Sequence, residues 1–274
     1  MFDVAQLSFQ GLLDNDYEAP ELFDTCNPER ELEAGDIINA IESLRSGDFA
    51  FFNLNLSDQT KTALSKIQIQ EPGILGLYSN LHNLHDKAMG FLREHALSNK
   101  DAPYAFDVSK AIIEIVSSIL CACGYNDAEV TIRTHNQDPR YFPLWHIDKS
   151  HAEAMGLSES DNKSIFVIAL KGAPTLYQHT NSTLRKEFNL LANESSYTYG
   201  YDYTRQYTQG EGLDKLLPIN RAVQSNFGEG SVHLAGHVRG TIHAIPDAKE
   251  RLVIVVMPDK TEIIKQFDKH VRKI

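Results

Sequence analysis

Two side chains able to bind a metal ion stand close together in FPLWHIDKSH (142–151), where His146 and Asp148 are two residues apart. On a β-strand, residues at this spacing point to the same face, so the imidazole and the carboxylate would lie side by side. Together they suit a divalent first-row metal ion. The pair alone is weak support, because His151 and Glu153 repeat the same spacing nearby.

A third ligand is expected from the segment FGEGSVHLAGHVRGTIHAIPDAKERLVIVVM (227–257). It contains three histidines, His233, His237 and His243. We favour His243, because it lies on the predicted strand GTIHAI, directly before a turn. His237 stands between two glycines in a likely turn position, and His233 is an alternative that could also face inward.

Arg251 follows that turn as the first residue of a very apolar strand, RLVIVVM. Its guanidinium is planar, always charged and shaped to bind a carboxylate through two parallel hydrogen bonds. The alternative is an ordinary strand-edge arginine that pairs at the surface with Glu250 or Asp247. Its place after His243 favours the binding role.

The ordered pattern HxD…H…R, formed by His146, Asp148, His243 and Arg251, resembles that of the Fe(II)/2-oxoglutarate-dependent oxygenases. These enzymes are built on a double-stranded β-helix, also called a jelly roll. The lead-in VTIRTHNQDPRYFPLWHID is similar to the strand–turn–strand of prolyl-hydroxylase-like members, and the turn GAPTLY is similar to bacterial members of unknown function. The resemblance covers about residues 128–257.

The resemblance implies a non-haem Fe(II) centre held by His146, Asp148 and His243. Two histidines and one carboxylate form a facial triad that leaves three coordination positions open. By resemblance, 2-oxoglutarate takes two of them and O₂ the third. The implied reaction is hydroxylation or a related oxidation, with release of succinate and CO₂.

The resemblance also assigns Arg251 to the distal carboxylate of 2-oxoglutarate. The family often has Ser or Thr two residues after this arginine, whereas this chain has Val253, and the spacing from the histidine is short. We therefore expect another residue to share the binding of the cosubstrate, and Tyr177 and Arg133 are the candidates.

The expected fold class is α+β, a double-stranded β-helix with a helical N-terminal region packed against it. Short β-type runs separated by turn residues are typical of sandwiches and barrels. They lie at residues 128–135, 164–172, 175–180, 230–236, 240–245 and 251–257. The expected organisation is a mainly helical region at 1–124, a catalytic core at 125–258 with an insertion at 181–226, and a C-terminal helix at 259–274.

Within the first half, apolar residues at helical spacing predict helices over 31–48, 72–97 and 106–124, and residues 49–57 could form a strand. The insertion contains a tyrosine-rich stretch, SSYTYGYDYTRQYTQGEG (195–212), with little periodicity. It is either a lid or substrate-recognition loop or a solvated insertion.

The composition of the chain argues against nucleic acid and membranes as partners. The net charge of −11 argues against nucleic acid. No apolar run has the length of a membrane span, and the N-terminus lacks the basic start of a classical signal peptide. The three cysteines, Cys26, Cys121 and Cys123, are odd in number, which makes a disulfide framework unlikely and favours a cytoplasmic location.

Other functions fit the same residues. A cupin-like isomerase or hydrolase, with zinc as one possible metal, would also use histidine ligands on a β-barrel. A non-catalytic jelly-roll module could bind a partner through the tyrosine-rich stretch. Trp145, beside His146, is more often a core residue than a substrate contact. The sequence contains no motif that identifies the substrate, whether a small molecule or a protein.

Overall fold

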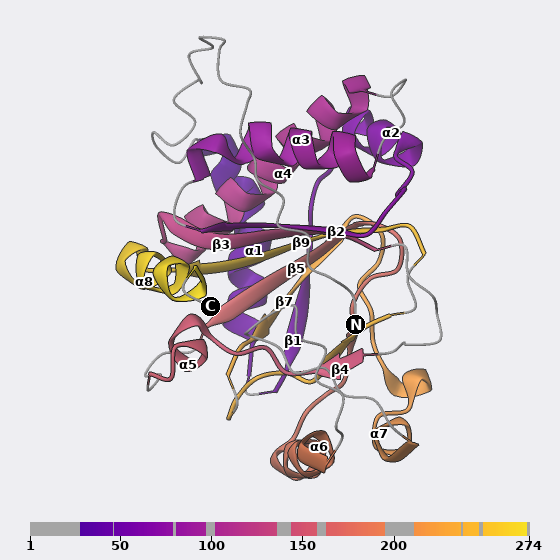
Figure 1. Ribbon diagram of the computed structural model, residues 1–274, viewed down its shortest axis with the longest axis vertical. Coiled ribbons are helices and arrows are strands. Elements are labelled where there is room, and N and C mark those ends of the chain that lie inside the picture. The colour runs from indigo at the N-terminus through magenta and orange to yellow at the C-terminus, as the bar shows by residue number, and fades with distance from the viewer. Residues whose placement is uncertain are drawn as a thin grey trace.

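The protein is a sandwich of two antiparallel sheets with helices on both outer faces (Figure 1). We describe it from a computed structural model. The described residues are 28–45, 47–78, 81–96, 102–135, 144–157, 163–194, 211–236, 238–246 and 249–272.

The larger sheet has six strands in the order β1-β7-β5-β9-β3-β2, all paired antiparallel. Its central strand β9 is buried along its whole length, as expected for a run so rich in valine and isoleucine. The strands are β1 Phe49–Asn53, β2 Gly73–Tyr78, β3 Asp127–His135, β5 Ser164–Lys171, β7 Glu229–Leu234 and β9 Arg251–Asp259.

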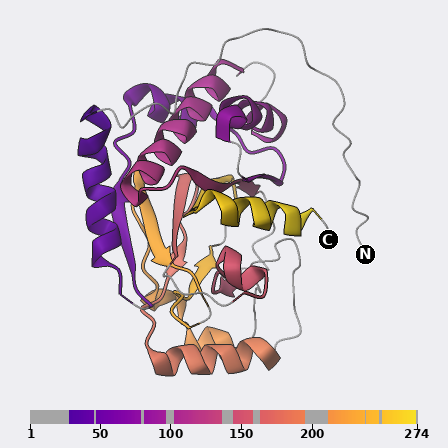
Figure 2. The same ribbon diagram turned by 90° about the vertical axis from the view of Figure 1, so that its left-hand side faces the viewer.

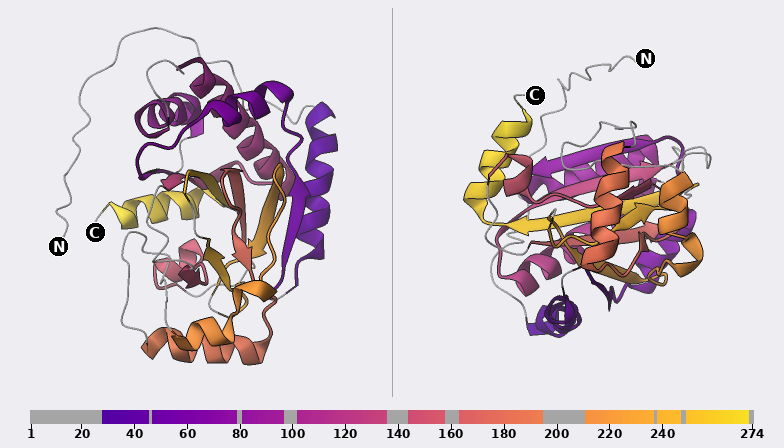
Figure 3. Two further views of the ribbon diagram at one scale, coloured as in Figure 1. Left: turned by 90° about the vertical axis from the view of Figure 1, so that its right-hand side faces the viewer. Right: turned by 90° about the horizontal axis from the view of Figure 1, so that it is seen from below.

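The smaller sheet has three strands in the order β4-β8-β6 and closes the other side of the sandwich (Figure 3). It consists of β4 Leu144–His146, β6 Leu176–Tyr177 and β8 His243–Ile245. An antiparallel bridge between Tyr177 and Val223 extends it. Consecutive strands β4 to β9 alternate between the sheets, with β4, β6 and β8 in the smaller one. This is the jelly-roll arrangement that the sequence predicts.

Helices of the first half cover the outer face of the larger sheet (Figure 2). The longest, α4, contributes apolar residues such as Ile112 and Ile119 to the main core against outward-facing residues such as Ile254. None of the described helices is long and apolar enough to cross a membrane. The helices of the first half are α1 Pro28–Ser43, α2 Asp58–Lys66, α3 Leu84–His95 and α4 Ala102–Cys123, with a 3₁₀ turn η1 at Leu81–Asn83. The second half includes α5 His151–Ala154 and α8 Thr261–Val271.

The expectation of one helix over 72–97 is wrong for its first part, which forms β2 and then η1 before α3 begins. Strand β2 pairs with β3 at the edge of the larger sheet, from Gly73↔Thr134 to Tyr78↔Glu129. Glycine lowers helix propensity by about 1 kcal/mol relative to alanine, and this segment contains two. Strands β1 and β2 therefore bring residues from within 1–124 into the sheet, and the division at residue 124 stays a prediction.

The insertion 181–226 contains helical elements that the sequence analysis did not predict: α6 Ser182–Glu194, α7 Glu211–Leu216 and the 3₁₀ turn η3 Ile219–Arg221. Leu184, Phe188 and Leu191 of α6 recur at helical spacing and pack on the outer face of the smaller sheet. Most of the tyrosine-rich stretch, residues 195–210, lies outside the described residues.

We expected no disulfide framework, and Cys121 is nevertheless disulfide-bonded. Cys123 is a free thiol. Burial raises the pKa of Cys123 to about 12, so this thiol stays protonated and unreactive at neutral pH.

Candidate metal centre

The side chains of His146, Asp148 and His243 converge between the two sheets. One ligand atom from each lies within 4.8 Å of the other two, and all three residues are buried. His146 Nε2 lies 3.6 Å from Asp148 Oδ1, and His243 Nε2 lies 3.3 Å from Asp148 Oδ2. Ligands about 2.0–2.2 Å from a metal ion stand roughly 3 Å apart when they are adjacent, so these spacings suit a shared ion.

Strand register brings the two histidines together. Strands β4 and β8 are antiparallel neighbours, and His146 and His243 are directly opposed, with their rings 4.1 Å apart. Because side chains alternate along a strand, both point into the sandwich while Trp145 and Ala244 point outward. Asp148 follows β4, and its main-chain carbonyl accepts a hydrogen bond of 2.8 Å from Gly236 N.

His243 is held in a form suited to bind a metal. Its Nδ1 lies 3.0 Å from the carbonyl oxygen of Thr241. A carbonyl only accepts, so Nδ1 carries a proton, and Nε2 is the ring nitrogen on the side of Asp148 where a metal ion would bind. This pattern, with the second ring nitrogen bound to a main-chain carbonyl, is typical of metal-binding histidines. The donor set and the tautomer thus fit a divalent metal ion.

Arg251 is not the surface arginine of the alternative hypothesis. It is 2% exposed, and it points into the sandwich from the first position of β9. Its Nε donates to the carbonyl of Ala173 at 2.8 Å and its Nη2 to Thr175 Oγ1 at 2.8 Å. Glu250 pairs with Lys171 instead. The β5–β6 turn therefore fixes the guanidinium.

One pocket is lined by Arg251 and by both histidines of the candidate metal centre, His146 and His243. Arg133 of β3 lines it as well, and it stands opposite Val253 in the β3–β9 register. The described lining has no carboxylate, so it combines the cationic groups of Arg133 and Arg251 with apolar valine side chains. It is lined by Arg133, His135, His146, Val167, Thr175, His243, Ile245, Arg251, Val253 and Val255.

Tyr177 is not part of that lining. It points inward from β6, and its hydroxyl lies 2.8 Å from Ser231 Oγ and 3.4 Å from His233 Nδ1. His233 Nε2 lies 3.3 Å from Asp148 Oδ2, but His233 is not a member of the three-residue group that could hold a metal ion. The remaining alternative, His237, lies outside the described residues.

Trp145 is a core residue. It is fully buried in the cluster that joins the smaller sheet to α6 and α7, where Phe188 and Leu217 are among its members. Its side chain therefore fixes β4 from behind while His146 faces the interior, so the substrate-contact interpretation has no support from its position.

A buried charge network formed by four side chains escaped the sequence analysis. His151 Nδ1 lies 3.1 Å from Asp259 Oδ2, and its Nε2 lies 3.0 Å from Glu129 Oε2. Lys163 Nζ donates to Asp259 Oδ1 at 2.7 Å. In the sequence, His151 is visible only as half of a commonplace HxE pair. Its two partners are distant along the chain, since Asp259 is 108 residues away and Glu129 is 22 residues away.

Burial and hydrogen bonding have opposite effects on the pKa values of His151 and Asp259 in this network. Burial would lower the pKa of His151, but hydrogen bonds to Asp259 and Glu129 raise it above its usual value. Burial would raise the pKa of Asp259, but hydrogen bonds from His151 and Lys163 hold it below its usual value. The contacts in the network therefore favour the charged forms of His151 and Asp259.

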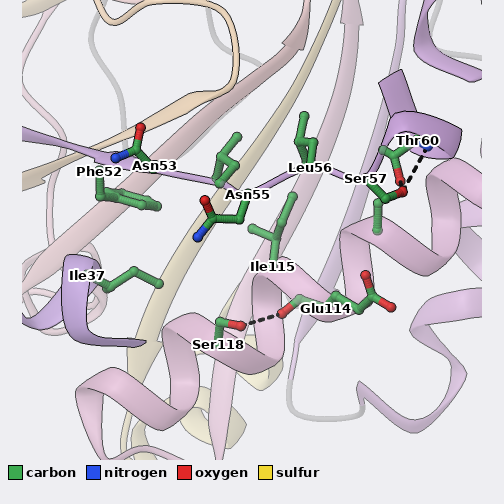
Figure 4. Close-up of a pocket in the computed structure, with 12 residues that line it drawn as sticks. Ile37, Phe52, Asn53, Asn55, Leu56, Ser57, Thr60, Glu114, Ile115 and Ser118 are labelled. Atoms are coloured by element: carbon green, nitrogen blue, oxygen red, sulfur yellow. Dashed lines mark hydrogen bonds between the residues drawn. The ribbon is translucent and has the colours of Figure 1, made fainter. Parts of the chain in front are cut away.

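A second cavity, of about 220 Å³, lies on the opposite side of the larger sheet (Figure 4). It is enclosed by α1, α4 and the segment after β1, and Phe52 and Ile115 are among its apolar walls. Asn53, Glu114 and Ser118 line it too. The described lining contains neither histidine nor arginine, so this cavity offers nothing comparable to the metal centre.

No protein-family model and no curated protein matches the chain. Among solved structures, it is similar to a prolyl hydroxylase from Trichoplax adhaerens in complex with a hypoxia inducible factor peptide, with a TM-score of 0.42 and 9% identity over 87% of this chain and 94% of that one. A prolyl-4-hydroxylase from Pseudomonas putida is similar with a TM-score of 0.37 and 11% identity, over 82% of this chain and 98% of that one. The Kdo hydroxylase KdoO, in complex with succinate and Fe(III), is similar with a TM-score of 0.38 and 13% identity, over 87% of each chain.

Proposed function

We propose that this protein is a non-haem Fe(II) and 2-oxoglutarate-dependent oxygenase. The observation that carries the proposal is one pocket that is lined by His146, His243 and Arg251. A metal centre beside a buried, fixed arginine suits a cosubstrate that chelates the metal and carries a carboxylate at its far end.

Within this proposal His146, Asp148 and His243 hold Fe(II). Arg251 binds the distal carboxylate, and Arg133 adds a second cation across from Val253, where the family often has a hydroxyl. The valine walls pack against the methylene carbons of the cosubstrate and exclude water. When bound, iron and 2-oxoglutarate supply the oxidising chemistry, in which the cosubstrate becomes succinate and CO₂.

Tyr177 remains a predicted contact of the cosubstrate, although its hydroxyl faces Ser231 rather than the arginine pocket. The substrate is a small molecule or a protein segment. A cytoplasmic location also stays a prediction, and disulfide-bonded Cys121 counts against it, because disulfides are rare in the cytosol.

The proposal is tested without knowledge of the substrate. The protein is first loaded with Fe(II) under anaerobic conditions and then titrated with 2-oxoglutarate. We expect the visible charge-transfer band of the chelate, followed by succinate release when O₂ is admitted. A folded protein that binds Fe(II) but gives neither the band nor succinate would contradict the proposal.

Replacing Arg251 with alanine is expected to weaken 2-oxoglutarate binding by about 30-fold or more, since loss of one partner of a buried charge pair costs about 2 kcal/mol or more. Fe(II) affinity should not change. The measurement is the same anaerobic titration of the charge-transfer band.

Two controls accompany this variant. Thr175→Val removes a hydrogen-bond partner of Arg251 while keeping the cation, so it should have a smaller effect. Arg239→Ala removes an exposed arginine and should have none. Equal binding by the Arg251 variant and the wild type would argue against this anchor.

A second candidate function is a different metal enzyme on the same scaffold, such as a cupin-like isomerase or hydrolase. The observation that favours it is His233, a third imidazole whose Nε2 lies 3.3 Å from the Asp148 carboxylate. If three histidines bound the metal, fewer positions would remain for a chelating cosubstrate and O₂. The number of imidazoles on the metal, taken together with the 2-oxoglutarate band, therefore separates the two candidates.

A further inference from the structure

Strand β7 presents two polar side chains to the interior of the jelly roll. Ser231 and His233 point inward, whereas the inward positions of β5 and β9 are mostly apolar, as with Val167 and Val255. His233 is fully buried. A polar side chain at such a position is costly unless it is hydrogen-bonded, so its contacts indicate why it is there.

His233 spans the space between Tyr177 and the Asp148 carboxylate. Its Nδ1 lies 3.4 Å from the Tyr177 hydroxyl, and its Nε2 lies 3.3 Å from Asp148 Oδ2. Behind Tyr177, Ser231 Oγ is 2.8 Å away and donates to the Val167 carbonyl at 2.8 Å. A row of polar contacts thus connects the backbone of β5 to the carboxylate.

We propose that His233 is a positioning residue that fixes the orientation of the Asp148 carboxylate for metal binding, and is not itself a ligand. It stands outside the group formed by His146, Asp148 and His243, although its ring is only 4.3 Å from that of His243. The inference rests on the metal centre of the proposed function.

The physical need for such a residue lies in the Asp148 side chain. Its main chain is fixed by the hydrogen bond from Gly236 N, but the terminal torsion of an aspartate is broad and roughly two-fold. A donor at Oδ2 selects one orientation of the carboxylate. Loss of a hydrogen-bond partner of a metal ligand typically lowers metal affinity about 10- to 100-fold.

The test compares His233→Leu with His233→Gln in the full-length protein. Leucine removes the donor, and glutamine keeps an N–H group at a similar distance from the main chain. We expect Co(II) binding, measured by calorimetry, to weaken about 10- to 100-fold in the leucine variant and to recover largely in the glutamine variant. His179→Leu, which removes an exposed histidine, is the control and should bind Co(II) normally.

A second measurement uses the unaltered protein, so it does not depend on how the variants fold. X-ray absorption on the Co(II)-loaded wild type should count two imidazoles. Three imidazoles would overturn the positioning role and would make His233 a ligand. Wild-type affinity in a folded His233→Leu variant, or no gain from glutamine over leucine, would also overturn it.

These outcomes differ from a failure of the proposed function. Two imidazoles and a weakened leucine variant, together with an absent 2-oxoglutarate band, would support the role of His233 and reject the oxygenase. Three imidazoles with a normal 2-oxoglutarate band would reject the positioning role of His233 and support the oxygenase. Absence of Co(II) binding by the folded wild type would overturn both.

Discussion

Replacing His243 with alanine is expected to abolish Fe(II) binding and all metal-dependent turnover. The substitution removes one of two imidazoles from a three-residue group whose ligand atoms lie within 4.8 Å of one another. The loss of affinity should exceed the roughly 100-fold that removal of a ligand's hydrogen-bond partner can cost. Anaerobic Fe(II) titration measures it, and His146→Ala should behave in the same way.

Stability must be checked in parallel, since His243 is buried and alanine leaves a small cavity. Urea unfolding of the metal-free variants should show a folded protein. Native Fe(II) affinity in folded His243→Ala, together with its loss in a folded His233 variant, would show that His233 is the third ligand. That outcome would restore the alternative that the sequence left open.

The second large effect concerns stability rather than activity. Replacing His151 with leucine is expected to lower the free energy of unfolding by about 3–5 kcal/mol, because it leaves the buried Glu129 and Asp259 carboxylates with less positive charge. His151 is fully buried between them. Urea denaturation at pH 6 measures the change, and His82→Asn, at an exposed histidine, is the control.

The pH dependence of this effect follows from the shifted pKa values. The pKa of His151 is raised in the folded protein, so its stabilising contribution is complete below its unfolded value of about 6.5 and is lost as pH rises through the folded pKa. The pKa of Asp259 is lowered, so its contribution is complete above about 3.9 and is lost as pH falls through the folded pKa.

Both contributions are complete between about pH 4 and 6.5. The difference in unfolding free energy between wild type and His151→Leu should therefore be largest there and should shrink towards alkaline pH. A difference that is small at pH 6, or that grows as pH rises, would contradict the charged network.

The sequence predicted the parts of the fold that local patterns encode. Alternation and β-branched residues located β3, β5 and β9, and helical spacing located α4 and its end near Gly124, which has the positive φ of 67° that favours glycine. Local pattern failed at β2, where an apolar run with glycines forms the edge strand of the larger sheet by pairing with β3. It also failed at α6, whose apolar face is visible only at three positions within a polar segment.

For the candidate site, the sequence by itself determined the residue types and their order: a His–x–Asp pair, a later histidine and an arginine on the next strand. It could not decide between His233 and His243, nor the side to which Arg133 and Tyr177 point. Those outcomes depend on which strands are neighbours and in what register, and register is set by contacts between residues far apart in the chain.

Only the tertiary structure decided that His243 opposes His146, that Arg133 opposes Val253, and that His233 meets Asp148 from a different sheet. A shift of one residue in any of these pairings would turn the side chain to the other face. Both faces of the larger sheet are buried, with apolar residues towards the helices and the polar site towards the interior of the sandwich. This burial fixes the register, because a shifted alignment would place apolar and polar side chains on the wrong faces.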